Sequence, residues 1–148
     1  MPGLYYEQCE PGLVVAHEVR RTVTEADNVL FTTMSMNTAR LHLDAHHMAD
    51  TPFGRPLVNS LFTLALVVGL SVTDVAFDVS IANLGFDAVK FPAPVFHGDT
   101  IRAETEIVER RLSSSRPNAG IVTYEHRGFN QDDALVCSVR RTTLVKTR

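Results

Sequence analysis

The sequence lacks several features that would assign it to a common class of protein. Its 148 residues include no tryptophan and only two cysteines, and 14 Lys and Arg against 17 Asp and Glu give a net charge of −3. A mildly acidic chain without a basic block is a poor candidate for binding nucleic acid. Cys9 and Cys137 stand far apart and form no CxxC motif, so we expect two reduced thiols in a cytoplasmic protein.

The sequence also lacks a hydrophobic run long enough to cross a membrane. Its longest apolar stretch, 57–72, is interrupted by polar residues and glycine. It is shorter than the roughly 18 to 20 residues that a membrane span requires. The N-terminal segment MPGLYYEQCEPG has no basic start followed by an apolar run, which argues against a signal peptide. We therefore expect neither a membrane nor a nucleic acid as a partner.

What the sequence does contain is the composition of a folded domain, with 45% hydrophobic and 21% charged residues. The flexible connection at 113–120 is too short to separate domains, so residues 1–148 are expected to form one domain. The residue pattern predicts a strand and three helices, at 13–24, 24–35, 43–49 and 56–72. Four β-rich runs follow, at 75–91, 100–110, 120–129 and 134–146.

This order of elements predicts the architecture. Helices followed by a run of strands indicate an α+β fold rather than a doubly wound parallel sheet. The helix at 56–72 is apolar on nearly all sides, and such a helix is usually buried on most faces. A sheet wrapped around that helix would bury it. Unpaired sheet edges also favour self-association, so we expect a homodimer or a higher homo-oligomer.

The polar residues that carry chemistry lie between Asn37 and Ser60. His42 is expected at the end of a loop before two helices, and Gly54 just before the apolar helix. Helix N-termini present unpaired N–H groups and a positive partial charge. A histidine beside such donors can move protons while the donors hold a developing negative oxygen. By spacing alone, a solvated loop histidine is the alternative interpretation.

The same residues carry a family resemblance. The segments NTARLHLD (37–44) and TPFGRPLVNS (51–60) resemble those of the MaoC-like dehydratases, the (R)-specific enoyl-CoA hydratase family with the hot-dog fold. The segment VKFPAPVFHGDT (89–100) is similar to that family's strand–turn–strand segment. The segment LHLDAH (41–46) and the pair Asn59-Ser60 most resemble the mesaconyl-CoA hydratase, or β-methylmalyl-CoA dehydratase, branch.

The resemblance implies a hydro-lyase whose substrate is an acyl thioester of CoA. Water is added to, or removed from, the carbon two bonds from the thioester carbonyl. An Asp–His pair moves the protons, and a main-chain N–H binds the thioester oxygen as an enolate forms. The implied unit is a dimer with the active site at or near the subunit interface. No cofactor and no metal are implied, because CoA is part of the substrate.

Carried onto this chain, the resemblance assigns His42 as the catalytic histidine and Gly54 to the region that offers the oxyanion N–H. Asn59 and Ser60 stand where many relatives have His-Gly, and they are expected to support the site. The place of the catalytic Asp is taken by Asn37.

This last departure matters because a carboxamide cannot transfer a proton at neutral pH. Asn37 can hold the water or hydroxyl while His42 acts as the main acid–base group, since histidine titrates close to neutral pH. Alternatively, a second carboxylate, Asp44, moves into reach. Asp44 can instead orient His42 or cap a short helix.

The asparagine also suggests a substrate. A catalytic Asp beside a substrate carboxylate would be harder to ionise, and Asn37 removes that conflict. Arg40 and Arg55 lie in the two loops of the site, where a guanidinium can hold a carboxylate with two hydrogen bonds. We therefore hypothesise a branched dicarboxylic acyl-CoA, such as the methylmalyl-CoA and mesaconyl-CoA pair. For both arginines, a solvated surface position is the alternative.

Two further residues are candidates for contacts with the substrate. Phe53 would line either the acyl pocket or the core. Lys90 would reach a CoA phosphate or lie solvated on a strand. His42 and His46 are four residues apart, as in some zinc sites, but no third ligand is evident, so no metal is expected.

Two other functions stay open. The first is an acyl-CoA thioesterase on the same fold, which would aim a carboxylate or an activated water at the carbonyl carbon. The second is a non-catalytic acyl-CoA binding subunit, which the loss of the family carboxylate at Asn37 keeps in play.

Overall fold

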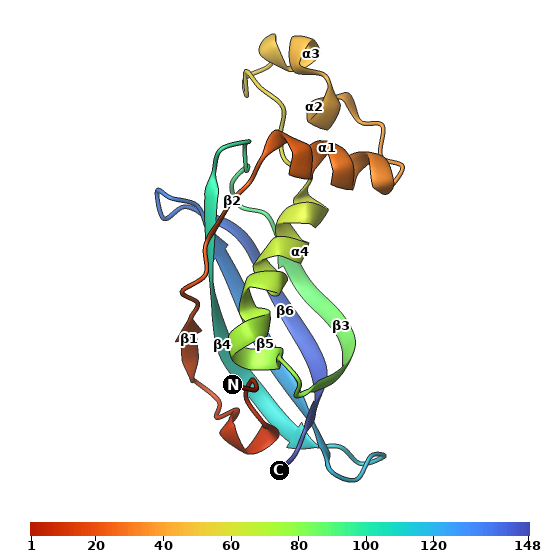
Figure 1. Cartoon of the computed structure of the whole chain (residues 1–148), viewed down its shortest axis with the longest axis vertical. Coiled ribbons are helices and arrows are strands. Elements are labelled where there is room, and N and C mark those ends of the chain that lie inside the picture. The colour runs from red at the N-terminus through yellow and green to blue at the C-terminus, as the bar shows by residue number, and fades with distance from the viewer.

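A long antiparallel sheet wraps around one central helix in the computed structural model, which describes residues 1–148 (Figure 1). The strands follow the order β1-β4-β5-β6-β3, and β2 also pairs with β4. Their bounds are β1 (Val14–Ala16), β2 (Arg21–Thr22), β3 (Ser80–Lys90), β4 (Thr100–Leu112), β5 (Ala119–Phe129) and β6 (Leu135–Lys146). The α+β prediction and all four C-terminal strands are confirmed.

The N-terminal strand prediction was too long. The segment 13–24 forms only the short strands β1 and β2, which pair with different parts of β4. Between them, His17 turns its side chain into the core, where it is 5% exposed. The strand β3 also begins later than predicted, because 72–76 forms a π-helical turn, η2 (Val72–Ala76).

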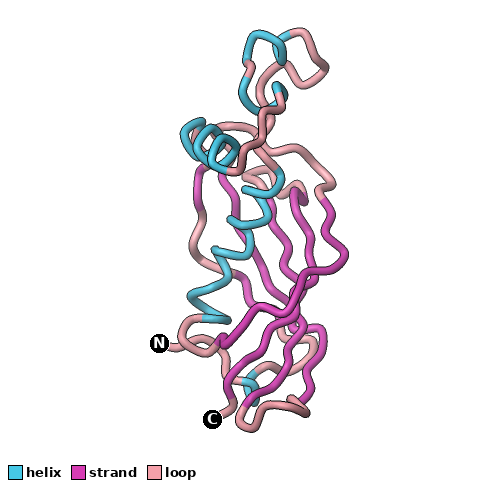
Figure 2. The backbone as a smooth tube through the Cα atoms, turned by 90° about the vertical axis from the view of Figure 1, so that its right-hand side faces the viewer, coloured by secondary structure: helices cyan, strands magenta, loops and turns pink.

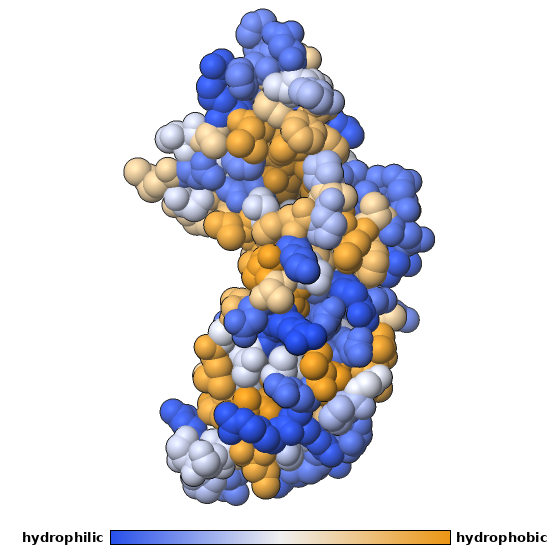
Figure 3. All heavy atoms as spheres, turned by 180° about the vertical axis from the view of Figure 1, so that it is seen from behind, coloured by the Kyte–Doolittle hydropathy of each residue, from blue (hydrophilic) through white to orange (hydrophobic).

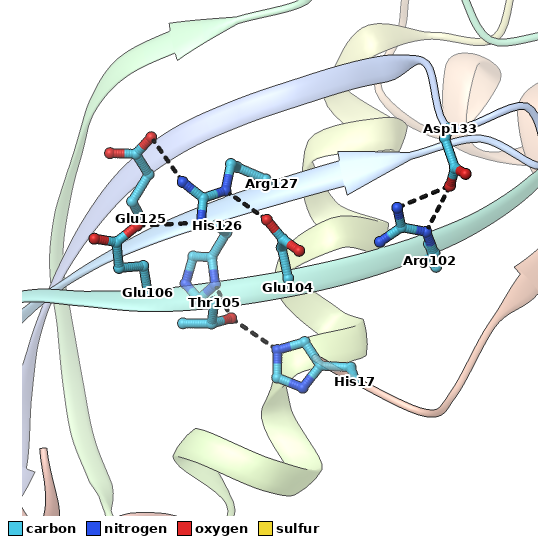
Figure 4. A network of polar contacts seen from close by, with 9 residues as sticks. All are labelled: His17, Arg102, Glu104, Thr105, Glu106, Glu125, His126, Arg127 and Asp133. Carbon is cyan, nitrogen blue, oxygen red and sulfur yellow. Dashed lines mark hydrogen bonds and ion pairs between the residues drawn. The ribbon is translucent and has the colours of Figure 1, made fainter. Parts of the chain in front are cut away.

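The alternation predicted for β4 holds. Ile101, Ala103 and Ile107 are buried, while the charged residues between them are only half-buried. On the other face of the sheet, Arg127 of β5 pairs with Glu104 and Glu106 of β4 (Figure 4). One face of the sheet therefore covers the helix, and the other is charged.

The helix α1 (Glu25–Met34) begins where its capping residues predict. The Thr24 side chain accepts the Asp27 N–H at 3.2 Å, and the Asp27 carboxylate accepts the Thr24 N–H at 2.9 Å. The short helix predicted at 43–49 is two pieces, α2 (Arg40–Leu43) and α3 (Ala45–Ala49). Together α1, α2 and α3 project from one end of the sheet (Figures 1 and 2).

The central helix α4 (Ser60–Ser71) starts four residues later than predicted, because Asn59 caps it by accepting the Leu61 N–H at 3.0 Å. The helix lies very close to the sheet where Val67 crosses Gly128. A Cβ atom on Gly128 would lie 2.3 Å from Val67 Cγ2. Only glycine permits this approach without displacing the valine.

In the single chain, α4 is not buried on most faces, contrary to the prediction. Its buried positions are Thr63, Val67, Leu70 and Ser71. Leu61 is 56% exposed, and a shallow apolar groove is lined by Leu61, Leu64, Ala65, Val68, Gly69 and Phe86. Figure 3 shows further hydrophobic surface at the narrowest part of the molecule, below the projecting helices. No helix has both the length and the apolar character needed to span a membrane.

Candidate active site

The His42 imidazole is fixed by one main-chain carbonyl. His42 lies in α2, half-buried, and its Nδ1 is 2.9 Å from the Leu57 oxygen. A carbonyl only accepts hydrogen bonds, so Nδ1 carries the proton and the neutral ring presents the lone pair of Nε2. The Leu57 N–H in turn donates to the Leu41 oxygen at 2.8 Å. The imidazole is therefore oriented as a proton acceptor.

His42 faces a mostly apolar cavity of about 320 Å³. Among its wall residues, only His42, Ser60 and Thr63 have polar side chains. The other wall residues are Leu41, Phe53, Leu57, Val58, Phe91, Pro92, Ala93, Pro94, Val95 and Val136. The structure thus brings together three of the predicted site residues, His42, Phe53 and Ser60, in a space suited to a short acyl chain.

One residue of the cavity wall has a free main-chain donor. Ser60 is the first residue of α4, and its N–H has no acceptor within the chain. The next N–H, of Leu61, donates to the side-chain oxygen of Asn59. The N–H of Thr63 donates to the main-chain oxygen of Asn59 at 3.1 Å. An unpaired N–H at the positive end of a helix dipole suits an oxygen that gains negative charge.

The prediction that Gly54 supplies this N–H is wrong. The Gly54 N–H donates to the Thr51 oxygen at 3.0 Å and closes a turn, with a φ of +70° at Gly54. Gly54 is exposed and does not belong to the cavity wall. The error follows from placing the start of α4 too early, since the free donors belong to the first turn that actually forms.

Asn37 shapes the turn that leads into α2. Its side-chain oxygen accepts the Ala39 N–H at 2.9 Å, and its own N–H donates to the Thr32 oxygen at 3.0 Å. Its amide NH₂ group donates to nothing within the chain, but Asn37 does not line the cavity. The structure therefore leaves Asn37 a donor that a water or hydroxyl can use, without bringing it to the cavity wall.

Asp44 caps α3 and does not come into reach of the cavity. Its carboxylate accepts the His47 N–H at 2.8 Å and the Arg40 Nε–H at 2.9 Å. The main-chain bond from His47 and the bond from Arg40 lower the pKa of Asp44 below its usual range. The capping alternative is thus confirmed, and a permanently ionised carboxylate is poorly suited to proton transfer at neutral pH.

Neither predicted arginine lies on the cavity wall. Arg40 pairs with Asp44, and its side chain is 64% exposed. The Arg55 guanidinium lies over the Phe96 ring, 3.9 Å from its centroid, in a cation–π contact. Arg55 nevertheless sits in the segment between the wall residues Phe53 and Leu57.

Two other predicted residues lie outside the cavity. Lys90 ends β3 and lines a separate polar hollow on the sheet together with Arg140 and Glu125. Asn59 is 3% exposed and serves as the cap of α4. No cation therefore faces the cavity from within this chain, apart from His42 when it is protonated.

Sequence reasoning missed Asn28. This residue of α1 is fully buried, and its side chain bonds to main-chain groups of His42, Leu57 and Asn59. A signal existed in the sequence, since Asn28 and Thr32 lie one turn apart on α1 among apolar neighbours. Two buried polar residues at that spacing indicate an internal hydrogen-bond network.

A second polar network lies in the core beside α4, toward its C-terminal end (Figure 4). His17 contacts Asp74 of η2 at 2.6 Å and the Thr105 hydroxyl at 2.8 Å, and that hydroxyl contacts His126 Nδ1 at 2.8 Å. Burial and the nearby Arg141 charge lower the pKa of His126 to about 3. His126 is therefore neutral near pH 7, with its Nδ1 hydrogen-bonded to the Thr105 hydroxyl.

Comparisons with known proteins agree with this geometry. The chain matches the MaoC like domain over residues 7–128. It is 31% identical over 153 residues to the beta-methylmalyl-CoA dehydratase of Chloroflexus aurantiacus, covering 99% of this chain and 41% of that protein. It is 32% identical over 148 residues to the mesaconyl-CoA hydratase of Cereibacter sphaeroides, covering 99% and 42%. The chain spans about two fifths of the length of these two relatives.

The solved structures define the fold. A Mycobacterium tuberculosis protein with a double hot-dog fold superposes with a TM-score of 0.86 at 23% identity, over 99% of this chain and 45% of that one. The fold is thus a hot-dog fold, as the resemblance implied. With the match over 7–128, the chain belongs to the MaoC-like domain family.

Proposed function

We propose that this chain adds water to, or removes it from, the α,β bond of an acyl-CoA thioester. The observation that carries the proposal is that His42 and Ser60, whose main-chain N–H is unpaired, line one apolar cavity. These two groups supply what the reaction needs, a proton carrier and a donor for an enolate oxygen. The names of the relatives, dehydratase and hydratase of CoA thioesters, support the same reaction.

In the direction of hydration, one imidazole serves both proton transfers. The thioester oxygen accepts the Ser60 N–H, and a water molecule donates a hydrogen bond to His42 Nε2. Nε2 takes a proton as the water oxygen bonds to the β carbon, and the electron pair of the double bond moves to give an enolate. The imidazolium then donates a proton to the α carbon. Dehydration is the reverse, and neither a metal nor a redox cofactor enters these steps.

The acyl group we propose is a branched dicarboxylic one of the mesaconyl type, as the names of the relatives suggest. The cavity wall itself offers it no cation. We propose that Arg55 leaves the Phe96 ring and pairs with the distal carboxylate at the cavity rim.

Arg55→Gln tests this part of the proposal. It should raise KM for mesaconyl-CoA about tenfold or more, the loss of about 1.4 kcal/mol of binding, and leave KM for crotonyl-CoA unchanged. Arg40→Gln is the matched control, because Arg40 is held by Asp44. Equal turnover of both substrates by the unaltered protein would remove the dicarboxylic proposal and leave the hydratase.

We also propose that the chain acts as a homodimer. The groove along α4 exposes Leu61 and Phe86, and β3 is a sheet edge with a free side. A second copy would cover both features. Sedimentation at several concentrations measures this, and a monomer at the concentration of the assay would contradict it.

A substrate panel tests the reaction class. The unaltered protein, His42→Ala and Asn37→Ala are compared on enoyl- and hydroxyacyl-CoAs by the absorbance of the conjugated thioester. Release of free thiol would indicate the thioesterase instead. Binding of acyl-CoA without turnover, together with activity gained in Asn37→Asp, would indicate a binding subunit.

A further inference from the structure

The buried side chain of Asn28 connects the two halves of the candidate site. Asn28 lies on α1, is fully buried, and does not line the cavity. We infer that Asn28 is a positioning residue that fixes the His42 imidazole and the start of α4 relative to each other. This inference rests on the proposed function for its kinetic consequences but not for its structural ones.

The amide nitrogen of Asn28 holds the histidine side of the site. It donates to the Leu57 oxygen at 3.0 Å, the same carbonyl that accepts His42 Nδ1–H. It also lies 3.3 Å from the main-chain oxygen of His42 itself. One NH₂ group thus restrains both the backbone that carries the imidazole and the acceptor that fixes its tautomer.

The amide oxygen of Asn28 holds the donor side of the site. It accepts the Asn59 N–H at 2.8 Å. Asn59 caps α4, and the next N–H along the chain is the unpaired one of Ser60, a residue of the cavity wall. The single planar amide therefore sets the separation between the proton carrier and the N–H that would bind an enolate oxygen.

A third contact keeps the amide itself in one orientation. The Nε2 atom of His97, in the turn before β4, lies 3.0 Å from Asn28 Nδ2 and accepts from it. The Thr32 hydroxyl donates to the amide oxygen from one turn further along α1, at 3.4 Å. A flipped amide would place its oxygen against the His42 and Leu57 carbonyls, which only accept, and its NH₂ group against the Asn59 N–H, which only donates. The network therefore permits only the observed arrangement.

Replacing Asn28 by leucine keeps the volume and removes every one of these bonds. We expect Asn28→Leu to lower kcat about 10- to 100-fold with little change in KM, because misplaced reacting groups slow the chemical step. Thr32→Val is the comparison variant, since it is equally buried on the same helix and removes only the hydroxyl that bonds to the Asn28 oxygen and the Asn59 amide, leaving the Asn28 NH₂ bonds to His42 and Leu57 in place. It should lose a similar amount of stability and keep kcat within about threefold.

A spectroscopic readout is independent of turnover. Nitrogen-15 NMR of labelled histidine should show a single His42 tautomer, protonated at Nδ1, in the unaltered protein and in Thr32→Val, and a mixture of tautomers in Asn28→Leu. If no acyl-CoA is turned over, the proposed function fails while this measurement still tests Asn28. A single tautomer in Asn28→Leu, or an equal loss of kcat in Thr32→Val, would overturn the inference.

One measurement needs no variant, so a variant that does not fold cannot obscure it. In the unaltered protein, the side-chain NH₂ hydrogens of Asn28 should be protected from exchange with solvent. Exchange as fast as that of an exposed asparagine would contradict the network.

Discussion

Histidine side chains lie near both ends of α4, but their surroundings differ. At the N-terminal end, His42 and Ser60 line a cavity, and the His42 Nε2 and the Ser60 N–H have no hydrogen-bond partner within the chain. Toward the C-terminal end, His17 and His126 are buried on either side of the Thr105 hydroxyl, away from any cavity. A histidine contributes to chemistry when one nitrogen is fixed and the other is left accessible, and to the core when it is enclosed.

The largest expected effect comes from His42, at the N-terminal end of α4. His42→Ala should lower turnover about 100- to 10,000-fold, the usual contribution of an acid–base group. Its unfolding midpoint should hardly change, because the imidazole is half-buried and makes one hydrogen bond. Steady-state kinetics and thermal unfolding on the same preparation measure both, and retained activity would mean that another group moves the protons.

The buried network of His17, Thr105 and His126 should make the stability of the fold depend on pH, and it should not affect turnover. Since the pKa of His126 is lowered from 6.5 to about 3, the unfolded chain binds more protons there than the folded one. The stability that the neutral ring contributes is complete above pH 6.5 and is lost as the pH falls toward 3. For one group this amounts to about 1.4 kcal/mol per pH unit at most.

His126→Leu isolates this contribution. At pH 7 the variant should be about 1 kcal/mol less stable and keep its kcat, because it loses one neutral hydrogen bond. At pH 4 it should equal or exceed the unaltered protein. Urea unfolding at pH 7, 5.5 and 4 gives the free energy of unfolding of both proteins. If this free energy depends on pH in the same way in both, His126 is not the source of the pH dependence.

The middle of α4 tests how strictly the helix is held against the sheet between the two ends. Gly128→Ala should destabilise the fold by about 1 to 3 kcal/mol, because the new methyl group overlaps Val67. Val67→Ala by itself should destabilise the fold. Combined with Gly128→Ala, it should recover part of the stability that Gly128→Ala loses. A double-mutant cycle in denaturant measures the coupling, and strictly additive effects would show that the helix shifts away instead.

The smallest expected effect concerns the cap at the N-terminal end of α4. Asn59→Ala should cost about 1 kcal/mol, since the Leu61 N–H loses its acceptor. It should also raise KM for acyl-CoA modestly if the cap keeps the Ser60 N–H directed at the thioester. Asn59→Ser, which can still cap, should restore both values, and failure to restore them would assign Asn59 a different role.

The sequence patterns predicted elements whose signals are local. The Thr24–Asp27 capping pair marked the start of α1, and alternation marked β4, because these features depend on residues three or two positions apart. The segment 37–60 was identified as the part that carries chemistry, and His42, Phe53 and Ser60 lie together in its cavity. Gly54 was assigned from the resemblance and the two arginines from the chemistry of carboxylate binding, and none of the three lines the cavity.

What the sequence by itself determined is the order of elements, the membership in the family and the identity of the histidine that faces the cavity. Only the tertiary structure decided which N–H is left free, which carboxylate is occupied as a cap, and that Asn28 joins three segments distant in the chain. The physical reason is that an unpaired donor is defined by every acceptor within about 3.5 Å of it, and such acceptors come from residues that folding brings together.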